Sequence, residues 1–198
     1  MVYGVYGAVT AVFVTRDGCQ TYIRERIRQG TIDGDLVKPL NLQLHLLYRD
    51  FAQKIAKFLQ FTLPSLLIFS VATRLFFRPQ LFDLIFFIAA LILAYGILFC
   101  VNFLFGMLCF YTLSIENIYF CYTGVILFLS GQMVPLWIFP DWARRIVEFL
   151  PFRYIFDAPM SIYIGRYAPK EALLILLVQA GWLTVLWILG ALSWAHVR

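Results

Sequence analysis

Long runs of apolar residues constrain this chain more than any other feature. Residues 84–115 and 172–194 are apolar almost without interruption. About 20 such residues are enough for a helix to cross the hydrocarbon layer of a bilayer. Inside hydrocarbon the backbone must satisfy its own hydrogen bonds, and unbroken apolar runs favour helices over the alternating strands of a barrel. The sequence therefore predicts an all-α fold, a polytopic integral membrane helix bundle.

The composition points to the same class. Of 198 residues, 62% are apolar and 14% are charged, whereas soluble domains are about 45–50% apolar and about 25% charged. The net charge of +5 is spread over loops, so we expect it to face an anionic membrane surface and not a nucleic acid. The four cysteines show neither metal nor redox spacing, and we expect no metal site.

The polar segments divide the predicted single domain into parts. We expect a partial span at 1–14, a cytoplasmic coupling region at 15–57, three spans within 58–139, an outer hairpin at 140–171 and a last span at 172–194, which makes about four full spans. Eight basic residues in 15–57 favour a cytoplasmic location for that region. Because the apolar run 1–14 is too short to cross the bilayer, we expect a span that is cut short there.

Two helices are predicted within the region 15–57. The first is a short basic helix that shows Arg24, Glu25 and Arg28 on one side and ends at Gly30. The second is an amphipathic helix that runs into the membrane, with apolar residues spaced by three and four. These residues are Leu44, Leu47, Phe51, Ile55 and Phe58. Two interpretations of 15–57 stay open: a docking surface for a partner, or a solvated loop that holds topology.

The outer segment 140–171 is richer in structure than a linker. Asp141 is predicted to cap a helix after Pro140, and Arg144 and Glu148 are spaced to form an ion pair. Pro151 ends that helix, and residues 152–163 form an apolar piece too short to span. This pattern predicts an interfacial or re-entrant hairpin. The alternative is a segment of the aromatic belt on the membrane surface.

No catalytic pattern is present. The chain has no G-x-x-x-x-G-K-[ST] phosphate loop. It departs from the pattern of CDP-alcohol phosphatidyltransferases, because Thr21 and Tyr22 stand where Ala-Arg is required. A secondary carrier normally buries a carboxylate or a lysine in mid-helix, and the apolar runs show neither. We therefore expect neither an enzyme nor a cofactor on this chain.

Three segments resemble those of ABC-2 type permeases, the membrane subunits of a class of ABC exporters. Residues 27–40, IRQGTIDGDLVKPL, are similar to the family's I-x-x-G-x-[IL]-[DE]-x-x-L-x-[KR]-P segment. Residues 130–142, SGQMVPLWIFPDW, resemble the fifth helix and its exit. Residues 150–154 and 157–159 resemble the outer hairpin before the sixth helix. The similarity extends over roughly 20–195 and implies that the first helix and most of the second are missing.

This resemblance implies a permease subunit of an export system in a bacterial inner membrane. A separate ATP-binding cassette subunit would hold ATP and Mg, and a second permease chain, identical or different, would complete the pathway within membrane lipid. The residues expected to dock the ATPase are Tyr22, Ile23, Arg24, Arg26, Ile27, Arg28, Gly30, Asp33 and Pro39. Those expected to form the outer gate are Gly131, Pro135, Pro140, Trp142, Pro151 and Pro159.

A second hypothesis comes from a different class of protein. A non-transporting membrane scaffold or assembly protein could use residues 15–57 to bind a cytosolic partner. The identity of that partner is what distinguishes this hypothesis from the permease.

Overall fold

The computed structural model of the chain describes residues 18–31, 42–64, 81–108, 115–134 and 136–197, and the regular elements in these ranges are helices. The predicted all-α class is therefore confirmed. The predicted partial span at 1–14 lies outside the described residues. The elements are α2 (Cys19–Arg28), α4 (Leu42–Lys57) with a π-helical turn (Phe58–Thr62), α6 (Leu81–Leu108), α7 (Ile115–Leu129), a 3-10 turn (Leu136–Ile138), α8 (Asp141–Phe149), α9 (Arg153–Tyr163) and α10 (Pro169–Val197).

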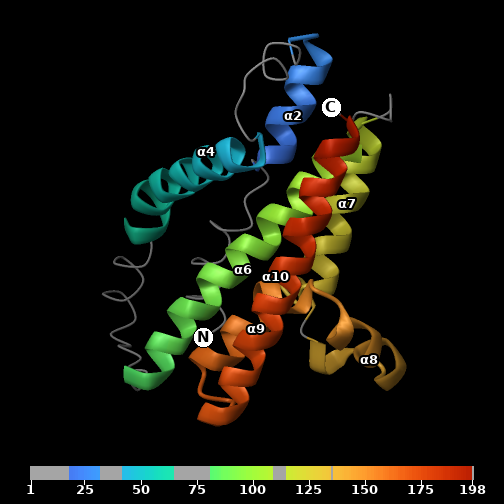
Figure 1. Cartoon of the computed structure of the whole chain (residues 1–198). Coiled ribbons are helices and arrows are strands. Elements are labelled where there is room, and N and C mark those ends of the chain that lie inside the picture. Colours follow the sequence, from blue (N-terminus) through green and yellow to red (C-terminus); the bar gives the residue numbers. More distant parts are fainter. Residues whose placement is uncertain (1–17, 32–41, 65–80, 109–114, 135, 198) are drawn as a thin grey trace.

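The long helices α6 and α10 form the centre of the molecule and lie side by side in the same direction (Figure 1). Both contain a segment long and apolar enough to cross a membrane, Phe82–Leu108 in α6 and Pro169–Ala195 in α10. Helices thus occupy two of the predicted spans. The second half of α6 is deeply buried, whereas α10 exposes a row of leucines, as expected of a helix that faces lipid. The other predicted spans remain predictions.

Helix α7 runs back along α6 and is shorter than predicted. The ring of Phe105 stacks on that of Tyr122 at 3.9 Å, and the Tyr122 hydroxyl donates a hydrogen bond to Asn102 at 2.6 Å. The last of the three spans predicted within 58–139 would reach the end of that range, but α7 ends at Leu129. The physical reason is Gly131, whose φ of +80° breaks the helix.

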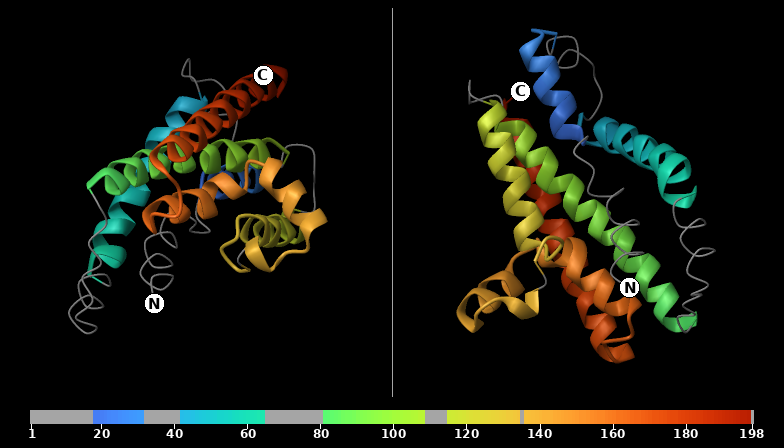
Figure 2. Two further views of the ribbon diagram at one scale, coloured as in Figure 1. Left: turned by 90° about the horizontal axis from the view of Figure 1, so that it is seen from below. Right: turned by 180° about the vertical axis from the view of Figure 1, so that it is seen from behind.

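The two helices of the outer segment differ in how they pack. Helix α9 lies along α6 and buries most of its residues, whereas α8 projects from the bundle (Figure 2). The pair Arg144–Glu148 is present, with 3.1 Å between Nε and Oε1. The predicted cap at Asp141 is wrong. Pro140 occupies the cap position with extended backbone, and Asp141 lies in the first helical turn without a capping hydrogen bond.

Candidate functional site

Helix α2 is fixed closely against the second half of α6. Ile23 is 1% exposed, and a Cβ added at Gly106 would come within 2.7 Å of its side chain. A larger residue at position 106 would force the Ile23 side chain to move, so the glycine favours this close packing of the two helices. The thiol of Cys19 points to the carbonyl oxygen of Phe99 at 3.8 Å. Burial raises the pKa of this thiol well above its usual value.

The basic residues of α2 differ in their surroundings. The Arg24 guanidinium lies 5.0 Å from the ring centre of Tyr119 on α7. Arg26 donates to the Tyr22 hydroxyl at 3.0 Å, and Arg49 of α4 lies 3.6 Å above the Tyr22 ring. Two of the three predicted docking arginines are therefore engaged within the chain.

The exposed surface of α2 is small and polar. Arg28, Glu25 and Gln29 are exposed, and Ile27 is half-buried. The helix stops at Gly30, whose φ is +65°, and the amide of Thr31 donates back to the carbonyl oxygen of Arg26 at 3.0 Å. This is the predicted glycine stop. The predicted docking residues Asp33 and Pro39 lie outside the described residues.

Helix α4 buries polar side chains that sequence reasoning missed. Gln43, Asp50 and Lys54 are 2%, 3% and 3% exposed. The Gln43 amide donates to the carbonyl oxygen of Trp187 at 3.4 Å, and the Tyr95 hydroxyl donates to the Asp50 carboxylate at 2.9 Å. The positive charge of Lys54 acts on the same carboxylate. In the sequence, their one signal is that they recur at helical spacing on one face of α4.

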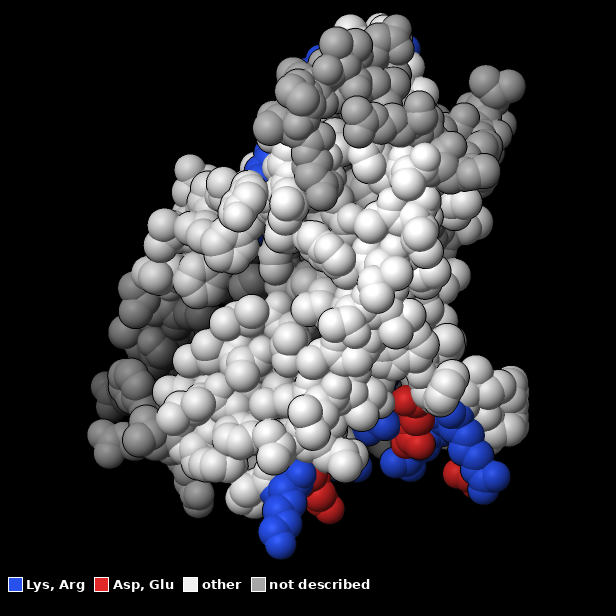
Figure 3. Space-filling view, in the orientation of Figure 1, with Lys and Arg blue, Asp and Glu red and all other residues white. Residues whose placement is uncertain are grey.

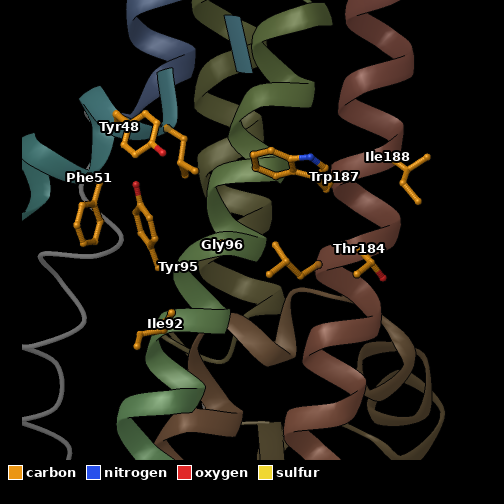
Figure 4. A pocket seen from close by; sticks show the side chains of 10 residues that line it. Tyr48, Phe51, Ile92, Tyr95, Gly96, Thr184, Trp187 and Ile188 are labelled. Carbon is orange, nitrogen blue, oxygen red and sulfur yellow. The ribbon is translucent and has the colours of Figure 1, made fainter. Parts of the chain in front are cut away.

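An apolar groove of about 590 Å³ separates α4 from α6 and α10. Figure 4 shows Tyr48 and Phe51 of α4 facing Tyr95 of α6, with Thr184 and Trp187 of α10 on the far wall. The Thr184 hydroxyl donates within its own helix, to the carbonyl oxygen of Gly181 at 2.8 Å. The groove thus offers apolar and aromatic surface, with few polar groups to orient a ligand.

A polar network at the end opposite the C-terminus joins α8, α9 and the turn that precedes α10 (Figure 1). The Nε atom of Arg153 donates to Asp157 at 3.1 Å, its Nη2 atom donates to Tyr167 at 2.9 Å, and Glu148 lies 3.6 Å away. Burial alone would lower the pKa of Arg153, but Tyr167 and Asp157 raise it above its usual value. Arg153 is therefore a permanent cation. Figure 3 shows charged side chains gathered at this end, below an uncharged surface.

The predicted gate residues are not brought together as one group. Pro151 and Pro159 are buried, and Gly131 lies near Leu136 and Asp157. Pro140 is exposed at the start of α8, and Trp142 is 70% exposed. Pro135 lies outside the described residues. Pro151 and Pro159 therefore lie within the helix bundle, whereas Pro140 and Trp142 lie at the start of the projecting α8.

Within the described residues, no three His, Cys, Asp or Glu side chains are grouped so that they could hold a metal ion. A profile of the family described as ABC-2 family transporter protein matches residues 1–197. No curated protein and no solved structure matches the chain significantly. The family profile covers nearly the whole sequence, and two helices have the length and composition of membrane spans. The chain belongs to the ABC-2 transporter family and is a membrane permease.

Proposed function

We propose that this permease is the membrane subunit of an ATP-driven export system in a bacterial inner membrane. Helix α2 docks a separate ATP-binding cassette subunit, and a second permease chain completes the transport pathway. One observation carries this proposal. Helix α2 is fixed on a membrane-spanning helix by its buried side, and its residues Arg28 and Glu25 are exposed. The helix lies at the same end of the molecule as the C-terminus (Figure 1).

The contacts of α2 supply a path for mechanical coupling. Ile23 packs into the space left by Gly106 of α6, and Arg24 lies against Tyr119 of α7. A displacement of α2 by nucleotide-driven closure of the ATPase would therefore act on two helices of the bundle at once. Such a displacement shifts the population between inward-open and outward-open arrangements of two permease chains.

The outer segment is the other part of this proposal. Helix α9 contains Pro159, lies along α6, and is linked to α10 by a hydrogen bond from Gln179 to the carbonyl oxygen of Tyr154. The same amide of Gln179 also donates to the carbonyl oxygen of Ala90 on α6. Because α9 contacts both spanning helices, a change in their tilt would move it. We assign the closing of the exit to α9.

Co-purification from the native host tests the ATPase partner. The full chain carries a C-terminal tag, and its membranes are solubilised in mild detergent. We expect an ATP-binding cassette subunit in near-stoichiometric amount. A well-folded chain that brings down a different cytosolic protein, cross-linked to residues 18–31, would instead establish the scaffold hypothesis.

Charge reversal at Arg28 tests the docking surface. Reversal of Arg24 or Arg26 would also remove the contacts with Tyr119 and Tyr22, so Arg28→Glu is the cleaner variant. We expect it to release the ATPase or to uncouple ATP hydrolysis from transport, with the unfolding temperature unchanged. The matched control is Lys170→Glu, an exposed charge at the opposite end. Equal coupling in both variants would contradict docking through α2.

A further inference from the structure

From Tyr48 onward, helix α4 is arranged opposite to a helix in water. Its buried side holds Leu42 and Leu46 and also the polar Gln43, Asp50 and Lys54, while Tyr48, Phe51 and Ile55 are 71%, 48% and 44% exposed. Within α4 no Asp, Glu, Lys or Arg side chain is fully exposed, and the exposed positions are apolar apart from His45 and Gln53. Water would favour the reverse orientation, because apolar surface is costly to hydrate. Hydrocarbon favours the orientation that is observed.

The depth of α4 follows from its contacts with α6. Asp50 accepts a hydrogen bond from Tyr95, and the ring of Phe51 lies 5.7 Å from the ring of Tyr95. Tyr95 is the middle residue of the membrane-spanning segment Phe82–Leu108. If α6 crosses the bilayer, the middle of α4 lies near the bilayer centre. The exposed residues beside it are then surrounded by acyl chains.

The groove has the volume and the apolar lining that suit a hydrocarbon chain. It holds about 590 Å³ between α4, α6 and α10, and its wall residues Tyr48, Ile92 and Ile188 are more than half exposed. These residues continue the apolar surface of α10, which includes Leu177 and Leu192. A dry apolar groove at this depth gains contact energy from an apolar occupant and none from water.

We propose that α4 is embedded at hydrocarbon depth and that the groove between α4, α6 and α10 binds an acyl chain of a membrane lipid. The lipid is the occupant that fits best, because the apolar wall is continuous with the lipid-facing surface and neither Asp50 nor Lys54 lines the groove. The segment 15–57 is then cytoplasmic only in its first part. This inference does not rest on the proposed ATPase partner.

Photolabelling with lipid tests the groove directly. The tagged full chain, with whatever co-purifies, is reconstituted into phosphatidylglycerol–phosphatidylethanolamine vesicles containing a phospholipid with a diazirine on its acyl chain. Mass spectrometry then locates the adducts. We expect adducts on α4, α6 and α10 at the lining positions Tyr48, Phe51, Ile92 and Ile188.

A filled groove supplies the matched comparison. Thr184→Trp places an indole in the groove and should lower labelling of its walls about fivefold, since the pocket volume is lost. Val185→Trp adds the same side chain at the next residue, which is exposed but does not line the groove. It should leave the adduct pattern unchanged. Equal labelling in the two variants would overturn the acyl-chain site.

A cysteine at Tyr48 distinguishes the other occupants. In the Tyr48→Cys variant, we expect slow reaction with a membrane-impermeant maleimide and no disulfide between two copies. Rapid reaction would show that α4 faces water, and an efficient disulfide would show that a second copy covers the groove. Either result would overturn the proposal.

Discussion

Helices α2 and α4 follow one another in the chain, but α4 buries charged side chains and α2 does not. Helix α2 buries Ile23 and exposes Glu25 and Arg28, as a helix in contact with water does. Helix α4 buries Asp50 and exposes Phe51. Both are amphipathic in sequence, and neither periodicity states which face is inside. The difference teaches that the surrounding solvent, and not the helical pattern alone, decides the orientation.

The buried face of α4 is tolerated because its polar groups find partners. The Asp50 carboxylate accepts from the Tyr95 hydroxyl and lies near the charge of Lys54, and Gln43 donates to the carbonyl oxygen of Trp187. Buried charges persist when they are paired and hydrogen-bonded. Among the described residues, the second oxygen of Asp50, Oδ1, has no hydrogen-bond partner. This face is therefore sensitive to substitution.

The largest expected effect comes from breaking the buried charge pair of α4. Asp50→Leu leaves Lys54 buried without that carboxylate and should lower the free energy of unfolding by about 3–5 kcal/mol. Denaturant unfolding of the purified chain in detergent measures this. The double variant Asp50→Leu with Lys54→Leu should recover much of the loss. A double variant no more stable than the single one would show that the two charges do not interact.

A charge added to the exposed faces should have a smaller and unequal effect. Tyr48→Arg places a cation in hydrocarbon and should destabilise the chain in bilayer nanodiscs by about 2–3 kcal/mol. Glu25→Arg on α2 should change stability by about 0.5 kcal/mol at most, because that face is in water. Thermal unfolding of the two variants compares them. Equal losses would remove the distinction between the two helices.

The smallest effect is expected within α2, where the prediction concerns the reactivity of cysteines toward maleimide and not the stability of the chain. The raised pKa of Cys19 leaves little thiolate, and the thiol is buried against α6. Native Cys19 should therefore resist maleimide until the chain unfolds, including at mildly alkaline pH. A cysteine in place of the exposed Arg28 should react at once with no loss of stability. Rapid labelling of Cys19 in the folded chain would show that α2 separates from α6.

Local and length-dependent features were predictable from the sequence. Runs of apolar residues located α6 and α10, the glycine at position 30 located the end of α2, and the spacing of Arg144 and Glu148 gave their ion pair. Each depends on residues close together in the chain. The predicted docking and gating roles of the named residues remain predictions.

The orientation of α4 and the groove beside it could not be predicted in this way. Both depend on contacts between distant residues, such as Gln43 with Trp187 and Asp50 with Tyr95. In the sequence, Asp50 and Lys54 lie in the charged region 15–57, whose composition is typical of a solvent-exposed surface. The division of the outer segment into a buried α9 and an exposed α8 depends in the same way on the packing of α9 against α6.

Site-specific photo-crosslinking in native membranes tests the central comparison most directly. A benzophenone amino acid replaces Arg28 on α2 in one variant and Tyr48 on α4 in another, and the cross-linked products are identified by mass spectrometry. We predict that position 28 captures an ATP-binding cassette subunit and that position 48 captures lipid. Capture of the cytosolic subunit at position 48, or its absence at position 28 in a folded chain, would contradict the account.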